Sequence, residues 1–316
     1  MKILANDGIS QSGIDDLTTA GFEVLTTTVA QEQLVTFINS ENIVALLVRS
    51  ATTVRQDLID ACPGLKIIGR GGVGMDNIDV AYAREKGLNV INTPAASSES
   101  VAELVFAHLF SGVRFLYDSN RSMPLEGEKK FKNLKKAYAK GTELRGKTLG
   151  VIGFGRIGQA TAKMALGLGM KVIAFDPFME KTTVSLSFYD GQTVDFEIKT
   201  VSKETVLKES DFITLHVPAQ KDFVIGEAEL EMMKDGAALI NAARGGVVNE
   251  VALVAALDAD KLSFAGLDTF ENEPTPAVQI LMNSKISLTP HIGAATNQAQ
   301  DRIGSELASQ IISILK

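Results

Sequence analysis

The sequence predicts an α/β protein built from two doubly wound parallel sheets. Short apolar runs alternate with helical patterns along the chain, and this alternation restarts near residue 148. A glycine-rich turn lies between a strand pattern and a helix pattern at that restart. The length of 316 residues also favours two domains over one.

The first series of elements occupies the N-terminal part of the chain. Residues 1–5 are strand-like and begin the series. Alternating strand and helix patterns follow, and such alternation predicts βαβ units with helices on both faces of a parallel sheet. Strands are expected at 44–48, 65–69 and 89–91, and helices at 58–61 and 80–86.

A helical pattern over 101–117, with Ser97 and Ser98 as candidate N-caps, links the first series to the second. A final helix at 298–315 is expected to return to the first domain. The predicted domains are therefore 1–96 with 290–316, and 97–289. The second series has strands at 148–152, 171–176, 211–217, 238–242, 264–268 and 286–289.

A β-hairpin is predicted inside the second series. Val184, Leu186 and Phe188 alternate with other residues, a second alternating run ends at Ile198, and Asp190-Gly191 lies between the runs. The hairpin is interpreted as a surface insertion. The alternative is an edge hairpin that pairs with another subunit.

The composition excludes several functional classes. With 45% hydrophobic and 22% charged residues, the chain is typical of globular proteins. A net charge of −7 offers no broad attraction for nucleic acid or an anionic membrane. Cys62 is the only cysteine, so no intrachain disulfide forms, and a reducing, cytoplasmic compartment is expected. No signal peptide or transmembrane segment is predicted.

The glycine-rich turn predicts a dinucleotide site. Gly153 permits a tight turn, Gly155 allows close approach of a pyrophosphate, and Gly158 lets the helix pack on the strand. Asp176 ends the next predicted strand, where a carboxylate accepts hydrogen bonds from a ribose 2′-OH and repels a 2′-phosphate. The prediction is NAD rather than NADP; the alternative is a purely structural turn with a solvated aspartate.

Three later strand ends carry polar residues suited to 2-oxo acid chemistry. Arg244 can hold a carboxylate and polarise the adjacent carbonyl, and His291 can exchange the hydroxyl proton. A glutamate in the segment 268–274 can orient the imidazole. Together these groups form a candidate catalytic set.

At these residues the chain resembles the D-isomer-specific 2-hydroxyacid dehydrogenases, and within them the short-form D-3-phosphoglycerate dehydrogenases. The resemblance extends over nearly the whole chain. It includes the three strand-end segments, the glycine-rich turn, and the segments 48–52, 69–77 and 141–144. It implies a Rossmann NAD-binding domain inserted into a flavodoxin-like substrate domain, with the site in the cleft between them and a homodimer as the assembly.

The resemblance implies that Arg244, Glu273 and His291 are the catalytic set, and it also implies the residues that contact each ligand. The cofactor contacts that it adds to the glycines and Asp176 are Val73, Arg156, Ile157, Val217, Ala242, Asp268 and Gly293. The implied substrate contacts are Arg49, Ser50, Gly72, Val73, Gly74 and Lys136. For Lys136 the alternative is one more charge on the solvated face of an amphipathic helix.

The expected reaction is oxidation of D-3-phosphoglycerate by NAD to 3-phosphohydroxypyruvate, the first step of phosphorylated serine biosynthesis. The alternatives are reduction of hydroxypyruvate or glyoxylate, D-lactate formation, and an NAD-sensing corepressor or scaffold without turnover. The chain stops soon after the catalytic domains, so serine feedback through a C-terminal regulatory domain is not expected. His108 and His216 are interpreted as structural, and no metal site is predicted because no cluster has ligand spacing.

Overall fold

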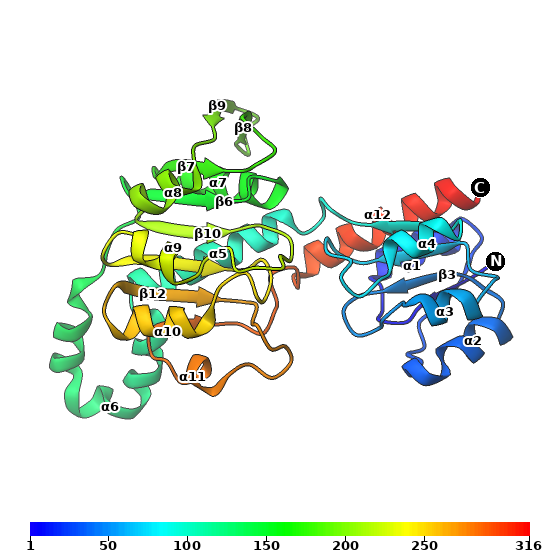
Figure 1. Cartoon of the computed structure of the whole chain (residues 1–316), viewed down its shortest axis with the longest axis horizontal. Helices are drawn as coiled ribbons and strands as arrows, with labels where there is room; N and C mark the ends of the chain where they lie inside the picture. The colour runs from blue at the N-terminus through cyan, green and yellow to red at the C-terminus, as the bar shows by residue number, and fades with distance from the viewer. The chain divides into compact units, whose positions relative to one another are not determined.

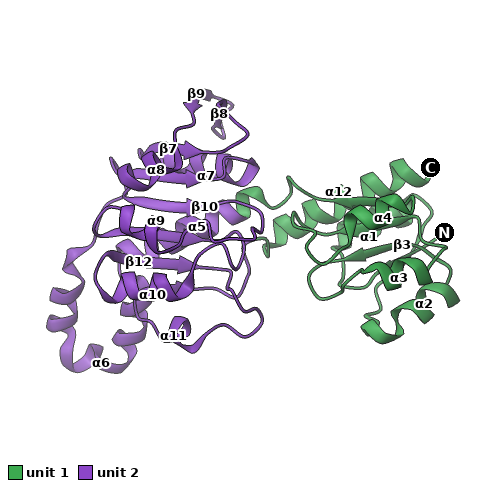
Figure 2. Ribbon diagram, viewed as in Figure 1, with its two compact units in different colours: residues 1–100, 294–316 green, residues 101–293 purple.

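The computed structural model describes residues 1–316 as two compact units. Unit 1 contains Met1–Ser100 and Ala294–Lys316, and unit 2 contains Val101–Gly293 (Figure 2). Each unit has its own parallel sheet, which confirms the predicted fold class. None of the helices combines the length and the apolar content that crossing a bilayer requires.

Unit 1 is a five-stranded sheet in the order β2-β1-β3-β4-β5, with every pair parallel. This is the flavodoxin-like order that the resemblance implied. The short edge strand β2 and the helices before residue 43 are elements that the apolar pattern did not mark. The strands are β1 (Lys2–Ala5), β2 (Glu23–Leu25), β3 (Ile43–Val48), β4 (Ile67–Arg70) and β5 (Asn89–Asn92).

Helices cover both faces of this sheet (Figure 1). Alternate strand residues such as Leu46 and Leu47 enter two separate apolar cores, as the pleat requires. A Cβ on Gly13 would lie 2.9 Å from the backbone of Gly304, so glycine is needed where α1 crosses α12. The helices are α1 (Gln11–Thr19), α2 (Leu34–Ser40), α3 (Gln56–Ala61), α4 (Val80–Glu85) and α12 (Asn297–Leu315).

Unit 2 is a six-stranded parallel sheet in the order β13-β12-β11-β10-β6-β7. β7 lies on one side of β6, and β10 and the strands after it lie on the other side. The strand order therefore reverses between β6 and β10, which is the topological switch point of a Rossmann unit. The strands are β6 (Thr148–Ile152), β7 (Lys171–Phe175), β10 (Phe212–Leu215), β11 (Ala237–Asn241), β12 (Leu262–Leu267) and β13 (Ile286–Leu288).

The helices of unit 2 enclose this sheet in two apolar layers. One core contains residues of α5 and α7, and the other contains residues of α8, α9 and α10. The helices are α5 (Ser98–Val113), α6 (Leu116–Ala137), α7 (Arg156–Gly167), α8 (Lys203–Glu209), α9 (Glu227–Met232), α10 (Glu250–Asp258) and α11 (Val278–Leu281).

The single helix predicted over 101–117 is wrong in detail. α5 ends at Val113, and Phe115 adopts a left-handed conformation with φ of 55°, after which α6 starts at Leu116. A left-handed residue cannot continue a right-handed helix, so the chain turns there. Ser98 does not act as a side-chain cap, since its buried hydroxyl has no hydrogen-bond partner.

The predicted hairpin is confirmed as β8 (Lys181–Ser187) paired antiparallel with β9 (Thr193–Lys199). Val184 and Ile198 are buried in the core of unit 2. The hairpin joins the edge of the main sheet by one parallel bridge between Ala174 and Thr200. It therefore lies beside β7, where the Rossmann order would place a further parallel strand.

Candidate active site

The carboxyl ends of all six strands of unit 2 carry predicted site residues. Because the strands are parallel, these ends lie at one edge of the sheet, where ligands bind in doubly wound folds. The glycine-rich turn follows β6. Asp176 follows β7, Val217 follows β10, Ala242 and Arg244 follow β11, Asp268 and Glu273 follow β12, and His291 and Gly293 follow β13.

Two glycines of the turn are required by close contacts. Gly153 has φ of 89°, and a Cβ there would lie 2.5 Å from the carbonyl oxygen of His216. A Cβ on Gly158 would lie 2.3 Å from the carbonyl oxygen of Gly153. The absence of a side chain at Gly153 lets the turn lie against the segment after β10, and its absence at Gly158 lets α7 start close to the end of β6.

Gly155 differs because a Cβ there would enter open space. Gly155 is the N-cap of α7 and makes no side-chain cap, so the first helical N–H groups have no partner from a capping side chain. An open approach to a helix N-terminus is the environment that a pyrophosphate requires. The turn therefore fits a dinucleotide.

Asp176 also takes part in the geometry of the turn. Its Oδ2 accepts a hydrogen bond from Phe154 N at 2.8 Å, and its Oδ1 accepts one from Phe178 N at 2.9 Å. Each carboxylate oxygen retains acceptor capacity, so the group can still receive a ribose hydroxyl. The aspartate thus connects the end of β7 to the glycine-rich turn, a contact that the sequence did not predict.

The structure brings His291 and Glu273 into direct contact. His291 Nδ1 lies 2.8 Å from Glu273 Oε2, and both side chains are partly exposed. Because a carboxylate can only accept, Nδ1 carries the proton of this hydrogen bond and Nε2 of a neutral ring is left to accept a proton. Both residues line a pocket of about 420 Å³ with Phe270, Thr289 and Pro290 among its walls.

The loop that carries Glu273 is fixed at two places. Glu273 Oε1 accepts the N–H of Phe270 at 3.0 Å. Glu250 Oε1 accepts the N–H of Glu271 at 2.8 Å, and Glu271 Oε1 accepts the N–H of Glu250 at 2.7 Å. Burial raises the pKa of Glu250, and the charges of Glu271 and Glu273 act in the same direction.

The backbone of Arg244 is positioned by the side chain of Asn241. The side-chain amide of Asn241 donates to the carbonyl oxygen of Arg244 at 2.8 Å, and its oxygen accepts from Ala243 N at 3.1 Å. A Cβ on Gly245 would overlap the carbonyl oxygen of Phe270. Glycine at 245 therefore lets the Arg244 segment lie against the loop that carries Glu273.

In unit 1 the predicted substrate residues occupy the carboxyl ends of two paired strands. Arg49 and Ser50 follow β3, and Gly72, Val73 and Gly74 follow the adjacent β4. The structure thus brings these five residues to one edge of the unit 1 sheet.

Two polar side chains fix the loop after β3. Asp7 Oδ2 accepts the N–H groups of Arg49 at 2.6 Å and Thr52 at 3.0 Å, and Asn77 Nδ2 donates to both of their carbonyl oxygens. Sequence reasoning missed Asp7. Its place two residues after the first strand, beside a predicted substrate loop, is the signal that could have found it.

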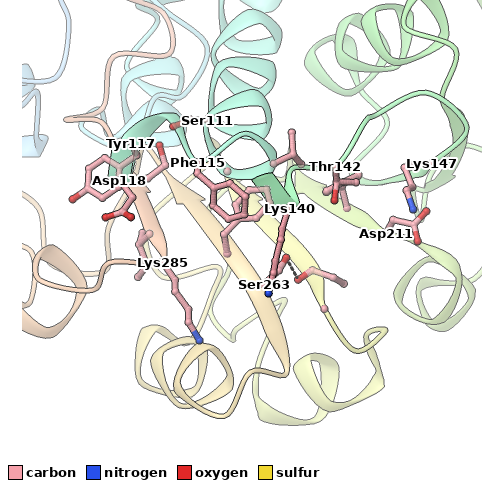
Figure 3. A pocket seen from close by; sticks show the side chains of 18 of the residues that line it. Ser111, Phe115, Tyr117, Asp118, Lys140, Thr142, Lys147, Asp211, Ser263 and Lys285 are labelled. Atoms are coloured by element: carbon pink, nitrogen blue, oxygen red, sulfur yellow. Dashed lines mark hydrogen bonds between the residues drawn. The ribbon is translucent and has the colours of Figure 1, made fainter. Parts of the chain in front are cut away.

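Lys136 is not brought to the other predicted residues of unit 2. It lies on α6, and the 3-10 turn that follows, η2 (Tyr138–Lys140), borders a different pocket of about 600 Å³. Figure 3 shows this pocket with Phe115, Lys140 and Lys285 among its labelled residues. Its walls include the residues just before β6, β10 and β13, which are at the amino ends of the strands, opposite His291.

Of the two remaining histidines, His108 is buried, whereas His216 is partly buried with its Nδ1 enclosed and without a hydrogen-bond partner. His216 Nε2 lies 3.2 Å from Thr161 Oγ1 and 3.1 Å from Thr214 Oγ1, and burial lowers the pKa of this histidine to about 3. His108 is 2% exposed and hydrogen-bonded. No group of three or more His, Cys, Asp or Glu side chains is arranged to hold a metal ion.

Comparison with known proteins gives consistent findings. Residues 106–293 match the NAD binding domain of the D-isomer specific 2-hydroxyacid dehydrogenases. A hydroxypyruvate reductase of Thermotoga maritima is 45% identical over 275 residues, covering 85% of this chain and 84% of the relative. A D-3-phosphoglycerate dehydrogenase of Archaeoglobus fulgidus is 39% identical over 320 residues, covering 100% of this chain.

The chain spans only 58% of the length of that Archaeoglobus relative. Among solved structures, a D-lactate dehydrogenase of Aquifex aeolicus complexed with NAD and lactic acid is 30% identical. It superposes with a TM-score of 0.75 over 100% of this chain and 95% of that one.

Proposed function

Because the chain belongs to the D-isomer specific 2-hydroxyacid dehydrogenases, we propose that it oxidises D-3-phosphoglycerate reversibly to 3-phosphohydroxypyruvate. This is the first step of phosphorylated serine biosynthesis. The observation that carries the reaction class is the contact of 2.8 Å between His291 and Glu273, at the same sheet edge as Arg244 and the NAD-binding turn.

The proposed roles follow from the hydrogen-bonding capacity of each group. NAD supplies the hydride acceptor when it is bound at the glycine-rich turn. His291 Nε2 takes the hydroxyl proton during oxidation, and Glu273 stabilises the resulting imidazolium through Nδ1. Arg244 binds the substrate carboxylate and polarises the oxygen on C2. In the reverse direction the imidazolium returns the proton to that oxygen.

The phosphorylated substrate is proposed on the basis of Arg49. Its backbone is fixed by Asp7 and Asn77, while its side chain forms no ion pair with a protein carboxylate. A guanidinium on a fixed backbone and without an acidic partner is suited to bind a phosphate. The Archaeoglobus relative, which is similar over the whole of this chain, supports the same substrate.

Reduction of hydroxypyruvate or glyoxylate is the second candidate. It is favoured by the higher identity of 45% to the Thermotoga hydroxypyruvate reductase. These acids lack a phosphate, so they do not require Arg49.

The test is NADH oxidation by the purified protein with 3-phosphohydroxypyruvate, hydroxypyruvate, glyoxylate and pyruvate at equal concentrations. Preference for the phosphorylated acid supports the proposal, and preference for another acid would identify that acid as the substrate in its place. Absence of turnover with all four would favour an NAD-sensing scaffold. Arg49→Ala should impair only the phosphorylated acid, whereas the control Arg55→Ala, which removes an ion pair to Asp79, should not.

A homodimer in the cytoplasm is the proposed state. α6 has 22 residues and none of them is buried, although Leu125 and Phe131 are large and apolar. Such a surface is typical of one covered by a partner. Lys136 lies on this helix, so in this proposal it contacts the substrate bound by a second copy of the chain. Sedimentation of Leu125→Asp should show monomers if α6 forms the interface.

The single buried cysteine is consistent with a reducing compartment.

A further inference from the structure

A chain of hydrogen bonds passes through the interior of unit 2 and centres on His108 of α5. His108 Nδ1 lies 2.9 Å from Ser287 Oγ, and His108 Nε2 lies 3.1 Å from Thr289 Oγ1. Thr289 Oγ1 then donates to Asp268 Oδ1 at 2.6 Å. The chain joins α5, β13 and the segment that follows β12, over sequence separations of about 180 residues.

The proton positions in this chain follow from what each group can donate. Asp268 as a carboxylate can only accept, so the single hydroxyl proton of Thr289 forms the hydrogen bond to Asp268 Oδ1. The oxygen of Thr289 can then only accept from His108, which places a proton on Nε2. Burial lowers the pKa of His108, against the opposing influence of Asp268, so the ring is neutral and Nδ1 accepts from Ser287.

Asp268 connects this chain of hydrogen bonds to the backbone beside His291. Its Oδ1 accepts the N–H of Ile292 at 2.8 Å, and its Oδ2 accepts the N–H of Gly293 at 2.8 Å. These are the two residues directly after His291, which itself has φ of 54°. The left-handed conformation is less favourable than the right-handed one for a residue with a Cβ, so the hydrogen bonds to its two neighbours help to hold His291 in it.

The packing of α5 on β12 is adapted to the imidazole. A Cβ on Gly266 would lie 2.7 Å from His108 Cβ, and a Cβ on Gly112 would lie 2.2 Å from the ring of Phe264. Glycines at these two points let α5 approach β12 closely enough for His108 to reach β13. The imidazole is therefore accommodated by the surrounding backbone and is not a chance contact.

We propose that His108, held as the neutral Nε2–H tautomer, is a positioning residue that fixes the backbone of His291 through Thr289 and Asp268. The inference deepens the proposed function, because it rests on His291 being the proton-transfer group. It assigns a role to a histidine that would otherwise be only a packed residue of an apolar helix.

The direct test is nitrogen-15 NMR of the uniformly labelled full-length protein at neutral pH. The chain has three histidines, so each imidazole can be assigned by one substitution. We expect His108 to show a protonated Nε2 and an unprotonated Nδ1. The opposite tautomer, or a doubly protonated ring, would overturn the proposal.

A matched pair of variants tests the effect on His291. His108→Gln keeps an N–H donor toward Thr289, whereas His108→Leu keeps similar bulk without a donor. We expect His108→Leu to shift the His291 resonances and to lower kcat at saturating NADH about three- to tenfold, the equivalent of one ordinary hydrogen bond, with His108→Gln closer to the parent protein. Thr289→Val should reproduce the effect of leucine without altering α5.

The outcomes separate this inference from the proposed function. Equal kcat and unchanged His291 resonances in the glutamine, leucine and valine variants would overturn the positioning role, even in an active enzyme. If the parent protein turns over no 2-oxo acid, the proposed function fails. The tautomer of His108 and the response of His291 to its removal would still decide whether the hydrogen-bond chain positions that loop.

Discussion

Alanine at Gly155 and at Gly158 should have opposite consequences, although both glycines belong to one turn. A Cβ on Gly158 would lie 2.3 Å from the carbonyl oxygen of Gly153 and 3.1 Å from Val151 Cγ1. Helix propensity alone favours alanine over glycine inside a helix by roughly 1 kcal/mol. The contact with a backbone oxygen outweighs this gain, because overpacking of this kind costs about 1–3 kcal/mol and backbone cannot rotate away.

A contact with backbone takes the upper part of this cost, about 2–3 kcal/mol, so the net loss is about 1–2 kcal/mol. We therefore expect Gly158→Ala to lower the melting temperature of unit 2 by about 2–8 °C, using roughly 2–4 °C per kcal/mol for a domain of this size. Gly155→Ala should leave stability within about 1 kcal/mol, because the weaker N-cap and the smaller entropy of the unfolded chain oppose each other. Its φ of −70° and ψ of −162° are open to alanine. NADH affinity should nevertheless fall about tenfold to hundredfold, the loss of one charge-assisted hydrogen bond.

Scanning calorimetry of the protein without cofactor measures the first effect, and titration of NADH fluorescence measures the second. The absence of tryptophan leaves the NADH signal free of energy transfer from indole. Parental NADH affinity in Gly155→Ala would show that the pyrophosphate does not approach this turn. An unchanged melting temperature in Gly158→Ala would refute the contact argument.

Three further predictions concern ionisable side chains. His291→Ala should lower kcat about 10²- to 10⁴-fold without unfolding the protein, because the side chain is half exposed; steady-state rates at the parental level would remove it from the mechanism. Asp176→Ala should raise the ratio of kcat/KM for NADPH over NADH, and should also slow both reactions because Phe154 N loses its acceptor; an unchanged ratio would mean that another group selects the cofactor. Burial lowers the pKa of His216 to about 3 from an ordinary value of 6.5, so the unfolded chain binds more protons between these values and the free energy of unfolding falls as pH falls. Urea titrations between pH 6 and 4.5 should therefore show that the free energy of unfolding falls by up to about 1.4 kcal/mol per pH unit, and His216→Asn should reduce this slope. Equal slopes in the two proteins would contradict the lowered pKa of His216.

The local sequence pattern predicted most of the strands because a buried parallel strand needs a continuous apolar run. β6 was predicted with its bounds, and β7 and β13 within one residue. β2 has three residues at the edge of its sheet and only partial burial, so it leaves little apolar signal. The break at Phe115 was also hidden, because an aromatic residue gives no local sign of a left-handed conformation.

The candidate site divides in the same way. Residue types and glycine spacing depend on local backbone geometry and chemistry, so Gly153, Gly155, Asp176 and His291 could be singled out from the sequence. The distance from His291 to Glu273 could not, because it depends on how two loops after neighbouring strands are folded.

By itself the sequence determined the fold class, the dinucleotide turn, the hairpin and the residue types available for hydride and proton transfer. These follow from apolar periodicity and from backbone conformations that act over a few residues. The tertiary structure decided which partner each polar group has: Phe154 for Asp176, Glu273 for His291, and Thr289 for His108. Such pairings join residues up to 181 positions apart, and only the packing of helices on the sheet brings their donors and acceptors within reach.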